Sequence, residues 1–261
     1  MNKNRFIGVD LAWAPDRNHT GIAVLQRSGK GAELVVCSEE LHKLEAVRDF
    51  ILEHSSTNAV VAVDAPLILK NQHGQRPCET RIGERFGRYD ASAHSANLTK
   101  MPDPGGVTLV SWLVSAGVMH APNPAEDRRR SGRWVFEVYP HPAHVVLFGL
   151  KRIIKYKKGR VAERRKGLAA FRSYIRTCLT RLTPRLIPND LLERLLADDL
   201  ERLKGKALKH YEDTLDAVFC AYLAFFYWYW GGERNEMIGD LQTGYIINPL
   251  LRWAHGELIE N

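Results

Sequence analysis

Acidic side chains interrupt several otherwise apolar segments of this chain. Asp10 lies in "FIGVDLAW", Asp64 lies in "AVVAVDAPL" and Glu137 lies in "RWVFEVYPHP". Asp213 and Asp216 are three residues apart in "EDTLDAVFCAYLA", so a helix would present them on one face. Because an unpaired carboxylate is costly to bury, we expect these acids to share a site instead of being scattered through the core.

The chemistry open to such a set of acids is metal binding. Carboxylates gathered from separate elements repel one another at neutral pH unless cations lie between them. Hard ions such as Mg²⁺ or Mn²⁺ accept carboxylate oxygens as ligands, and two ions about 4 Å apart can promote phosphodiester hydrolysis. All five acids are therefore candidate catalytic residues, and the expected ligands of two such ions are Asp10, Asp64, Asp213 and Asp216.

Each acid, taken singly, also suits a structural role. The two strand-end aspartates could be ordinary turn residues. Glu137 could pair with a nearby arginine such as Arg133. Asp213 and Glu212 could favour a helix N-terminus, with Asp216 solvated in the next turn. The joint occurrence of the acids on separate elements is what favours a shared site.

Hydrophobic patterning predicts the elements that position these acids. Two strands joined by a polar turn around Pro15 to Asn18 are predicted to form a hairpin, and a proline just past Asp64 ends a later strand that is apolar up to that aspartate. Strands are expected at 5–13, 19–27, 32–39, 59–67 and 133–142, and helices at 41–51, 168–182, 192–203 and in the late apolar segment ending at 230. This order predicts a mixed α/β fold in a single domain, residues 1–261, with insertions at 70–131 and 150–205.

Composition favours a basic globular protein. The 261 residues are 45% hydrophobic, and 37 Lys and Arg against 30 Asp and Glu give a formal charge of +7, which suits a polyanionic partner. Four scattered cysteines without a CxxC pair indicate neither a zinc site nor a disulfide framework, and they suit the cytoplasm. The apolar run from Ala217 to Trp230 is shorter than the roughly 20 residues of a membrane span, so we expect a core helix.

Basic residues supply candidates for substrate binding. The run "KRIIKYKKGRVAERRK" holds nine Lys and Arg, which either contact phosphates or form a solvated helix face. In "RPCETR", an arginine could orient a phosphate or merely neutralise the acids. His141 and His144 could assist proton transfer or be structural. The candidate substrate-binding residues are Arg76, Arg81, Lys155, Lys158 and Arg160.

The acid-bearing segments resemble a known superfamily. Three segments, "IGVDLAW", "VAVDAP" and "EDTLDAVFCAYLA", resemble the acidic positions of ribonuclease H-like proteins. Their order is that of the RuvC-type resolvases. The chain is also similar, from Phe6 to Pro249, to a family of predicted RNase H-like nucleases catalogued as domain of unknown function 429. The blocks that carry this similarity are "RPCETRIGERFG", "EVYPHPAHVVLFGL", "YKKGRVAERRKGLAAF", "EDTLDAVFCAYLA" and "MIGDLQTGYIINP".

This resemblance implies a ribonuclease H-like mixed sheet layered with helices. It also implies a metal-dependent nuclease in which Asp10 bridges the ions, Asp64 is the fourth-strand ligand, and Asp213 and Asp216 are the helix pair. Glu137 matches an acidic position of the family that stands before a proline. Where the family block often has two adjacent aspartates, this chain has Glu212 and Asp213, so either acid could face the metal.

The expected function is hydrolysis of nucleic acid by two Mg²⁺ or Mn²⁺ ions, with RNA, DNA and branched junctions all open as substrates. Two rival functions remain. The segment "VDLAWAPDRNHTG" loosely resembles the phosphate-binding hairpin of actin-like kinases and ATPases, although it lacks the usual glycines. The chain could also be a non-catalytic module that binds nucleic acid or a protein. Tight ATP binding would favour the first rival, and nucleic-acid binding without Mn²⁺ uptake would favour the second.

Overall fold

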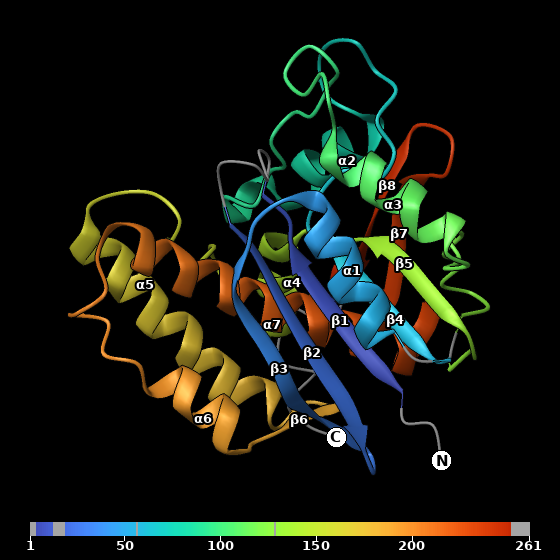
Figure 1. Ribbon diagram of the computed structural model, residues 1–261. Coiled ribbons are helices and arrows are strands. Elements are labelled where there is room, and N and C mark those ends of the chain that lie inside the picture. Colours follow the sequence, from blue (N-terminus) through green and yellow to red (C-terminus); the bar gives the residue numbers. More distant parts are fainter. Residues whose placement is uncertain (1–3, 13–18, 56, 128, 252–261) are drawn as a thin grey trace.

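The structure is a computed structural model that describes residues 4–12, 19–55, 57–127 and 129–251. Within these residues, six strands form one mixed sheet (Figure 1). They are β1 (Arg5–Asp10), β2 (Thr20–Ser28), β3 (Gly31–Leu41), β4 (Ala59–Val63), β5 (Arg133–Glu137) and β6 (Arg185–Ile187). The strand order is β5-β4-β1-β2-β3-β6, so the first strand lies near the centre of the sheet.

The direction of the strands brings three acid-bearing ends to one edge of this sheet. β1 pairs parallel with β4, and β4 pairs parallel with β5, so their carboxyl ends point the same way. Asp10 is the last residue of β1, and Glu137 pairs with Val63 at the ends of β5 and β4. Asp64 follows β4 directly, and its amide donates to the carbonyl of Val9, 2.8 Å away.

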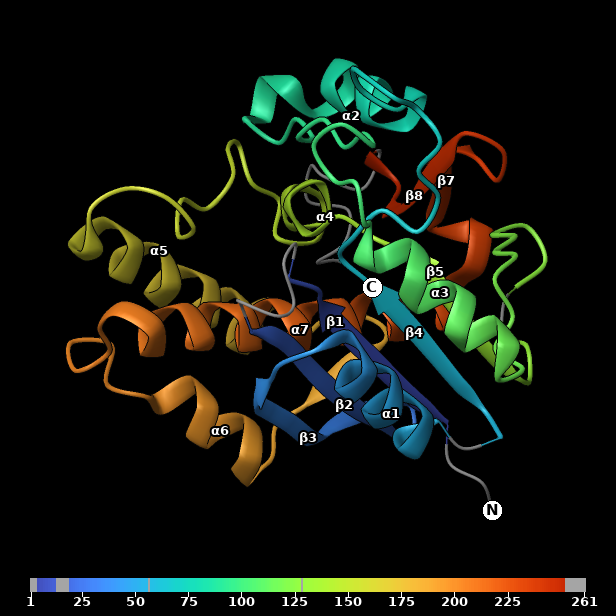
Figure 2. The same ribbon diagram turned by 45° about the horizontal axis from the view of Figure 1, so that its top comes forward.

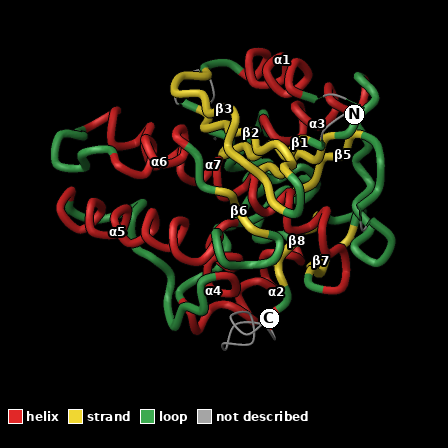
Figure 3. The backbone as a smooth tube through the Cα atoms, turned by 90° about the horizontal axis from the view of Figure 1, so that it is seen from below, coloured by secondary structure: helices red, strands yellow, loops and turns green. Residues whose placement is uncertain are grey.

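Helices cover both faces of the sheet, because alternate residues of each strand point to opposite faces. α1 (Leu44–His54) and α3 (Gly105–Ser115) pack on the face that holds Ile7 and Val9. α7 (Gly205–Trp230) lies across the opposite face, against Phe6 (Figures 2 and 3). The result is an α/β fold in which the mixed sheet lies between helical layers.

Two glycines allow α7 to lie directly on the sheet. A Cβ atom at Gly8 would stand 2.1 Å from the carbonyl oxygen of Ala217, and one at Gly21 would stand 2.1 Å from the carbonyl oxygen of Asp213. Such distances exclude any side chain at either position. Gly21 also pairs with Asp10 across β1 and β2, so the helix meets the sheet beside the end of the first strand.

The remaining elements surround this layered core. α5 (Val161–Tyr174) and α6 (Asp190–Ala197) lie together at one side, on the left in Figure 1. A separate apolar cluster joins α2 (Pro77–Phe86) and α4 (Pro140–Leu147) to a hairpin of β7 (Asn235–Asp240) and β8 (Gly244–Pro249). Short helical turns are η1 (Gly87–Tyr89), the π-helix η2 (Ile175–Leu179) and η3 (Gly231–Glu233).

The predicted core elements are confirmed, with different bounds. β1 to β5 and α1 form where patterning placed strands and a helix, whereas the expected turn at 15–18 lies outside the described residues. The helix expected at 168–182 starts earlier as α5 and ends in η2, and the one expected at 192–203 ends at Ala197 in α6. Residues 70–131 contain α2, η1 and α3, and residues 150–205 contain α5, η2, β6 and α6.

Helix α7 differs most from its prediction. It begins at Gly205, so Asp213 and Glu212 lie well inside it, and the suggestion that they mark a helix N-terminus is wrong. No described helix has both the length and the hydropathy needed to cross a bilayer.

Candidate functional site

Four aspartates meet where α7 crosses the edge of the sheet. Asp10 and Asp64 come from the ends of β1 and β4, and Asp213 and Asp216 come from the helix. Gly21 lets the backbone of Asp213 approach the sheet beside Asp10. We call these four residues the aspartate cluster. The cluster joins side chains that are more than 200 positions apart in the sequence.

A lysine ammonium lies among three of these carboxylates. The Nζ atom of Lys157 is 2.9 Å from Oδ2 of Asp216, and it is 4.0 Å from Oδ2 of both Asp10 and Asp64. Burial lowers the pKa of Lys157, but the surrounding carboxylates, Asp10 first, raise it well above its usual value overall. Lys157 is therefore a permanent positive charge at the centre of the cluster.

Tyr156, the residue before Lys157, anchors the backbone at Lys157 to the buried helix α7. Tyr156 is fully buried, and its hydroxyl donates to Oδ1 of Asp216 at 2.6 Å. Asp216 is also fully buried. Its Oδ1 atom accepts from Tyr156 and its Oδ2 atom faces the ammonium of Lys157. The deepest carboxylate of the cluster is thus held entirely by the protein.

A second lysine compensates the helix side of the cluster. The Nζ atom of Lys209 is 2.5 Å from Oδ1 of Asp213 and 2.8 Å from Oε1 of Glu212. Glu212 also accepts from Arg164 at 3.0 Å, and it is 1% exposed. Asp213 lines the cavity described below, whereas Glu212 does not. Of the two adjacent acids, Asp213 is therefore the one that faces the site.

The pKa values of three of these carboxyl groups are raised despite the two lysines. Burial raises the pKa of Asp213 to about 8, and Asp10 adds to the increase while Lys209 opposes it. Burial raises the pKa of Asp216 to about 6, although Lys157 lowers it. Burial also raises the pKa of Asp64 well above its usual value. Burial is thus the main cause of these raised pKa values, repulsion among the carboxylates adds to it, and a bound cation would oppose both.

The cluster opens into a cavity of about 660 Å³. Asp10, Asp64 and Asp213 line it together with Lys157 and Lys209, whereas Asp216 lies behind them. Apolar groups complete the wall, among them Leu11, Val138, Ile153, Ile154 and Ile246. This volume lies in the range of pockets that hold a small molecule or one nucleotide.

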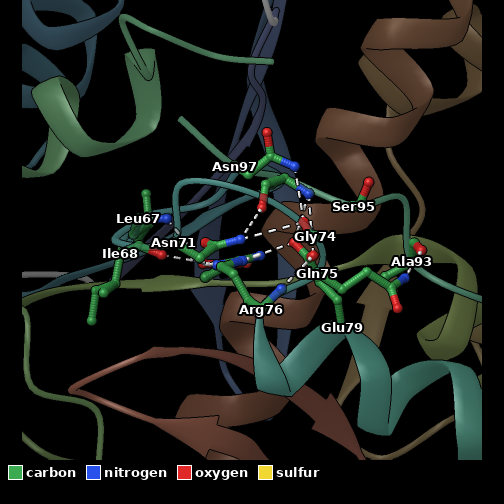
Figure 4. A network of polar contacts seen from close by, with 12 residues as sticks. Leu67, Ile68, Asn71, Gly74, Gln75, Arg76, Glu79, Ala93, Ser95 and Asn97 are labelled. Atoms are coloured by element: carbon green, nitrogen blue, oxygen red, sulfur yellow. Dashed lines mark hydrogen bonds and ion pairs between the residues drawn. The ribbon is translucent and has the colours of Figure 1, made fainter. Parts of the chain in front are cut away.

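Glu137 takes part in a different cluster. Its carboxylate accepts two bonds from the guanidinium of Arg76, at 2.9 and 2.6 Å, and one from the amide of Leu67 at 2.9 Å. Arg76 also bonds Glu79 at 2.8 Å. We call Arg76, Glu79 and Glu137 the arginine network; Figure 4 shows Arg76 and Glu79 facing each other within it. Glu137 thus pairs with Arg76. The pairing with Arg133, which the sequence offered as an alternative, does not form.

The arginine network ties the loop before α2 to the sheet. The amide of Ala96 donates to Glu79, and Asn71 donates to the carbonyl oxygens of Ala96 and Gly74 (Figure 4). Arg76 is only 2% exposed, although its atoms border the cavity. Its guanidinium is therefore engaged by protein acceptors, which supports the neutralising role and not the phosphate-binding role.

The other basic candidates lie in two different settings. Lys155 and Lys158 are exposed and line the cavity. Arg81 and Arg160 are also exposed, but neither belongs to the cavity wall. Of the predicted substrate-binding residues, Lys155 and Lys158 are thus the two placed to reach a molecule in the cavity.

The two histidine candidates also separate. His141 lines the cavity, and burial, followed by the charge of Lys157, lowers its pKa to about 3. His144 is fully buried among the rings of Phe148, Phe171 and Phe219. His144 is therefore a core residue, and His141 is a neutral imidazole at physiological pH.

The acids converge, but they do not have the spacing of metal ligands in this structure. In the described part of the chain, no three His, Cys, Asp or Glu side chains are spaced so that they could hold a metal ion together. The carboxylates are instead arranged about two lysine ammonium groups.

Three residues of the site were not singled out from the sequence: Tyr156, Lys157 and Lys209. Tyr156 and Lys157 lay inside the basic run, where a lone tyrosine beside a lysine was the available signal. Lys209 precedes Asp213 by four residues and Glu212 by three, which is the spacing of helical ion pairs.

Comparison with models of protein families identifies a family for this chain. The family model described as "Protein of unknown function (DUF429)" matches residues 8–243. No curated protein and no solved structure is significantly similar to the chain.

Proposed function

Since the chain belongs to this DUF429 family, its activity has to be inferred from its own site, and we propose that it is a divalent-metal-dependent phosphodiester hydrolase acting on nucleic acid. The observation that carries the proposal is the convergence of Asp10, Asp64, Asp213 and Asp216 at the wall of one cavity or just behind it. Structural turn or cap residues from three separate elements of the chain have no reason to meet in this way.

The arrangement of the sheet supports a ribonuclease H-like fold. β1, β2 and β3 are antiparallel neighbours, and β4 and β5 extend the sheet in parallel with β1. Acids stand at the ends of β1 and β4 and on a helix that crosses them. This placement agrees with the roles that the resemblance assigns to Asp10, Asp64 and the helix pair.

The donor set suits a hard divalent ion. Its members are carboxylates, whose pKa values are raised mainly by burial and further by their mutual repulsion, and a hard cation would oppose both effects. Asp10, Asp64 and Asp213 are the candidates to hold the ion, because their side chains line the cavity, but they would have to move closer together than the structure places them. When bound, such an ion supplies an activated water molecule and stabilises charge on the leaving oxygen. The number of ions is a separate question, because Lys157 already places one positive charge among the acids.

The protein groups around the acids suit a phosphate-bearing substrate. Lys155 and Lys158 are exposed at the cavity, and lysines at such positions attract backbone phosphates. Tyr139 and Ile246 add aromatic and apolar surface to the same wall, which suits an unpaired base. The overall charge of +7 agrees with a polyanionic partner.

Cleavage assays test the proposal directly. End-labelled single-stranded RNA, single-stranded DNA, duplex and four-way junction are incubated with the protein in Mg²⁺, in Mn²⁺ or in EDTA. We expect cleavage of at least one substrate in metal and none in EDTA. Asp10→Asn is expected to lower the rate at least about 100-fold, since it removes a charge that holds the ion.

A matched variant separates site effects from general charge effects. Asp49→Asn removes the charge of an exposed aspartate on α1, away from the cavity, and is expected to cleave like the wild type. Absence of cleavage on every substrate in both metals would overturn the proposal. ATP binding without nucleic-acid binding would instead favour the kinase-like rival.

Salt dependence tests the part assigned to the exposed lysines. Replacing both Lys155 and Lys158 by Gln is expected to weaken binding to every sequence alike. If each lysine contacts one phosphate, the slope of log K against log salt should fall by about 0.7 per contact on single strands. An unchanged slope would remove these two residues from the binding surface.

A further inference from the structure

The two lysines of the aspartate cluster are held very differently. Lys157 lies among Asp10, Asp64 and Asp216, and its side chain is 28% exposed. Lys209 reaches Asp213 from the preceding turn of the same helix, and its side chain is 51% exposed. The difference bears on how many metal ions the site can accept.

We infer that Lys157 permanently takes the place of one ion of a metal pair, and that a single divalent ion binds between Asp10 and Asp213 by displacing the Lys209 side chain. The inference rests on the proposed metal dependence of the site. It departs from the two-ion expectation, because the cation among Asp10, Asp64 and Asp216 is supplied by the chain itself.

The backbone around Lys157 is anchored on three sides. The hydroxyl of Tyr156 bonds the buried Asp216, and the carbonyl of Tyr156 accepts from Nε of Arg164 at 3.2 Å. The carbonyl of Lys155 lies against α5, where a Cβ atom at Gly167 would stand 2.2 Å from its oxygen. The segment is therefore docked in the core and cannot carry Lys157 away without breaking these contacts.

The surroundings of Lys157 also oppose movement of its side chain alone. Removing the ammonium would leave the fully buried Asp216 without its closest cation and would leave Asp10 and Asp64 facing it. An uncompensated buried charge is strongly unfavourable. Lys157 itself would then be a partly buried ammonium without a carboxylate partner. The binding free energy of an ion that displaced it would have to offset this cost as well.

Lys209 meets no such obstacle. Its partner Asp213 is on its own helix at the i+4 position, and half of its side chain already faces solvent. Asp213 itself is only 5% exposed, but an incoming ion would replace the ammonium as its cation while the lysine turns into solvent. Its second partner, Glu212, retains a bond to Arg164 when the lysine leaves. Displacing Lys209 therefore frees Asp213, next to Asp10, at small cost.

Counting bound Mn²⁺ tests the inference without any substrate. Equilibrium dialysis with metal analysis is expected to give one ion per chain for the wild type and for Lys157→Arg, which keeps the charge. Lys157→Gln is expected to bind two ions. Lys209→Gln is expected to bind one ion with a Kd lowered about two- to fivefold or more, because no ammonium then competes with the ion for Asp213.

The control for these counts is Lys151→Gln. Lys151 is an exposed member of the same basic run that does not line the cavity, and its loss is expected to leave one ion bound with unchanged Kd. Two ions on the wild type, or one ion on Lys157→Gln, overturns the inference but leaves metal-dependent hydrolysis standing. No ion on the wild type overturns both.

A second measurement uses only the wild-type protein, in case Lys157→Gln does not fold. Lysines are acetylated briefly with and without Mn²⁺, and the modified sites are quantified by mass spectrometry. We expect Mn²⁺ to increase the labelling of Lys209 at least twofold and to leave Lys157 protected. Increased labelling of Lys157 in Mn²⁺ would show that the metal displaces it, and the inference would be wrong.

Discussion

Among the described residues, two buried charge clusters lie at the same edge of the sheet, and their carboxylates are held by different kinds of donor. In the arginine network, Glu137 receives two bonds from one guanidinium and a third from a backbone amide. In the aspartate cluster, four carboxylates share two ammonium groups. Both clusters border the same cavity, but the carboxylate of Glu137 is bonded to protein donors at both oxygens, whereas the aspartates have mainly the two lysines.

This contrast separates a structural ion pair from a binding site. Both clusters combine acids at strand ends with acids on a helix, so residue type and the kind of element do not distinguish them. The hydrogen-bond donors do, although each cluster has one cation for every two acids. The two terminal nitrogens of Arg76 and the amide of Leu67 occupy both oxygens of Glu137, which leaves that carboxylate no free oxygen for a ligand. Glu137 is accordingly best explained as an anchor for the loop before α2, although the sequence placed it among the catalytic residues.

The largest expected effect comes from breaking the arginine network. Arg76→Met would leave Glu79 and Glu137 buried without a cation, and we expect a loss of about 3–5 kcal/mol in the free energy of unfolding, measured in urea. Arg81→Met, at an exposed position of the same helix, is expected to change stability by no more than about 0.5 kcal/mol. Equal losses in the two variants would contradict the structural role of the network.

An intermediate effect comes from the hydroxyl of Tyr156. Tyr156→Phe removes a bond to Asp216 and is expected to cost about 1.5–3 kcal/mol at pH 8, where Asp216 is ionised. The cost should be smaller at pH 5, below the Asp216 pKa of about 6. Tyr222→Phe is the control, since its hydroxyl bonds the neutral carbonyl of Pro184. A Tyr156 effect as independent of pH as the Tyr222 effect would argue against this pairing.

The smallest effect, and the only gain, is expected from Asp213→Asn. The pKa of Asp213 is raised to about 8 in the folded protein, so the folded state binds more protons than the unfolded state between about pH 4 and 8. Asp213 therefore destabilises the metal-free protein increasingly as pH rises through this window. We expect Asp213→Asn to gain roughly 1–2 kcal/mol at pH 8 and little at pH 4, allowing for the lost Lys209 pair.

Urea unfolding in EDTA at several pH values measures this gain. Asp49→Asn, on the surface of α1, should show the same pH dependence as the wild type. If Asp213→Asn loses stability at pH 8, the Asp213 carboxylate does not destabilise the metal-free protein, and the contrast with the arginine network disappears.

Much of the central sheet could be predicted from the sequence because its strands are apolar and separated by clear turns. β1, β2 and β4 follow this pattern, and their acids stand at ends that parallel pairing brings together. The short strand β6 could not be predicted in this way, because three residues are too few to show alternation. The start of α7 was missed because its first turns, from Gly205 onward, are polar.

The partners of the acids were harder to predict than the acids themselves. Glu137 pairs with Arg76, 61 positions earlier, through a loop that hydrophobic periodicity does not describe. Lys157 is one of nine basic residues in a single run, and only tertiary packing of Tyr156 distinguishes it from the others. Charge patterns along the chain therefore locate the negative groups, whereas the fold decides which positive group each one meets.

Gly21 has a consequence for mutational tolerance. It carries no functional atom, yet a methyl group there would collide with the backbone of Asp213 and push α7 outward. Asp213 would then move away from Asp10, the residue that pairs with position 21 across the two strands. In a saturation library, position 21 should therefore be as intolerant as the aspartates themselves, and its defect should be one of alignment, not of chemistry.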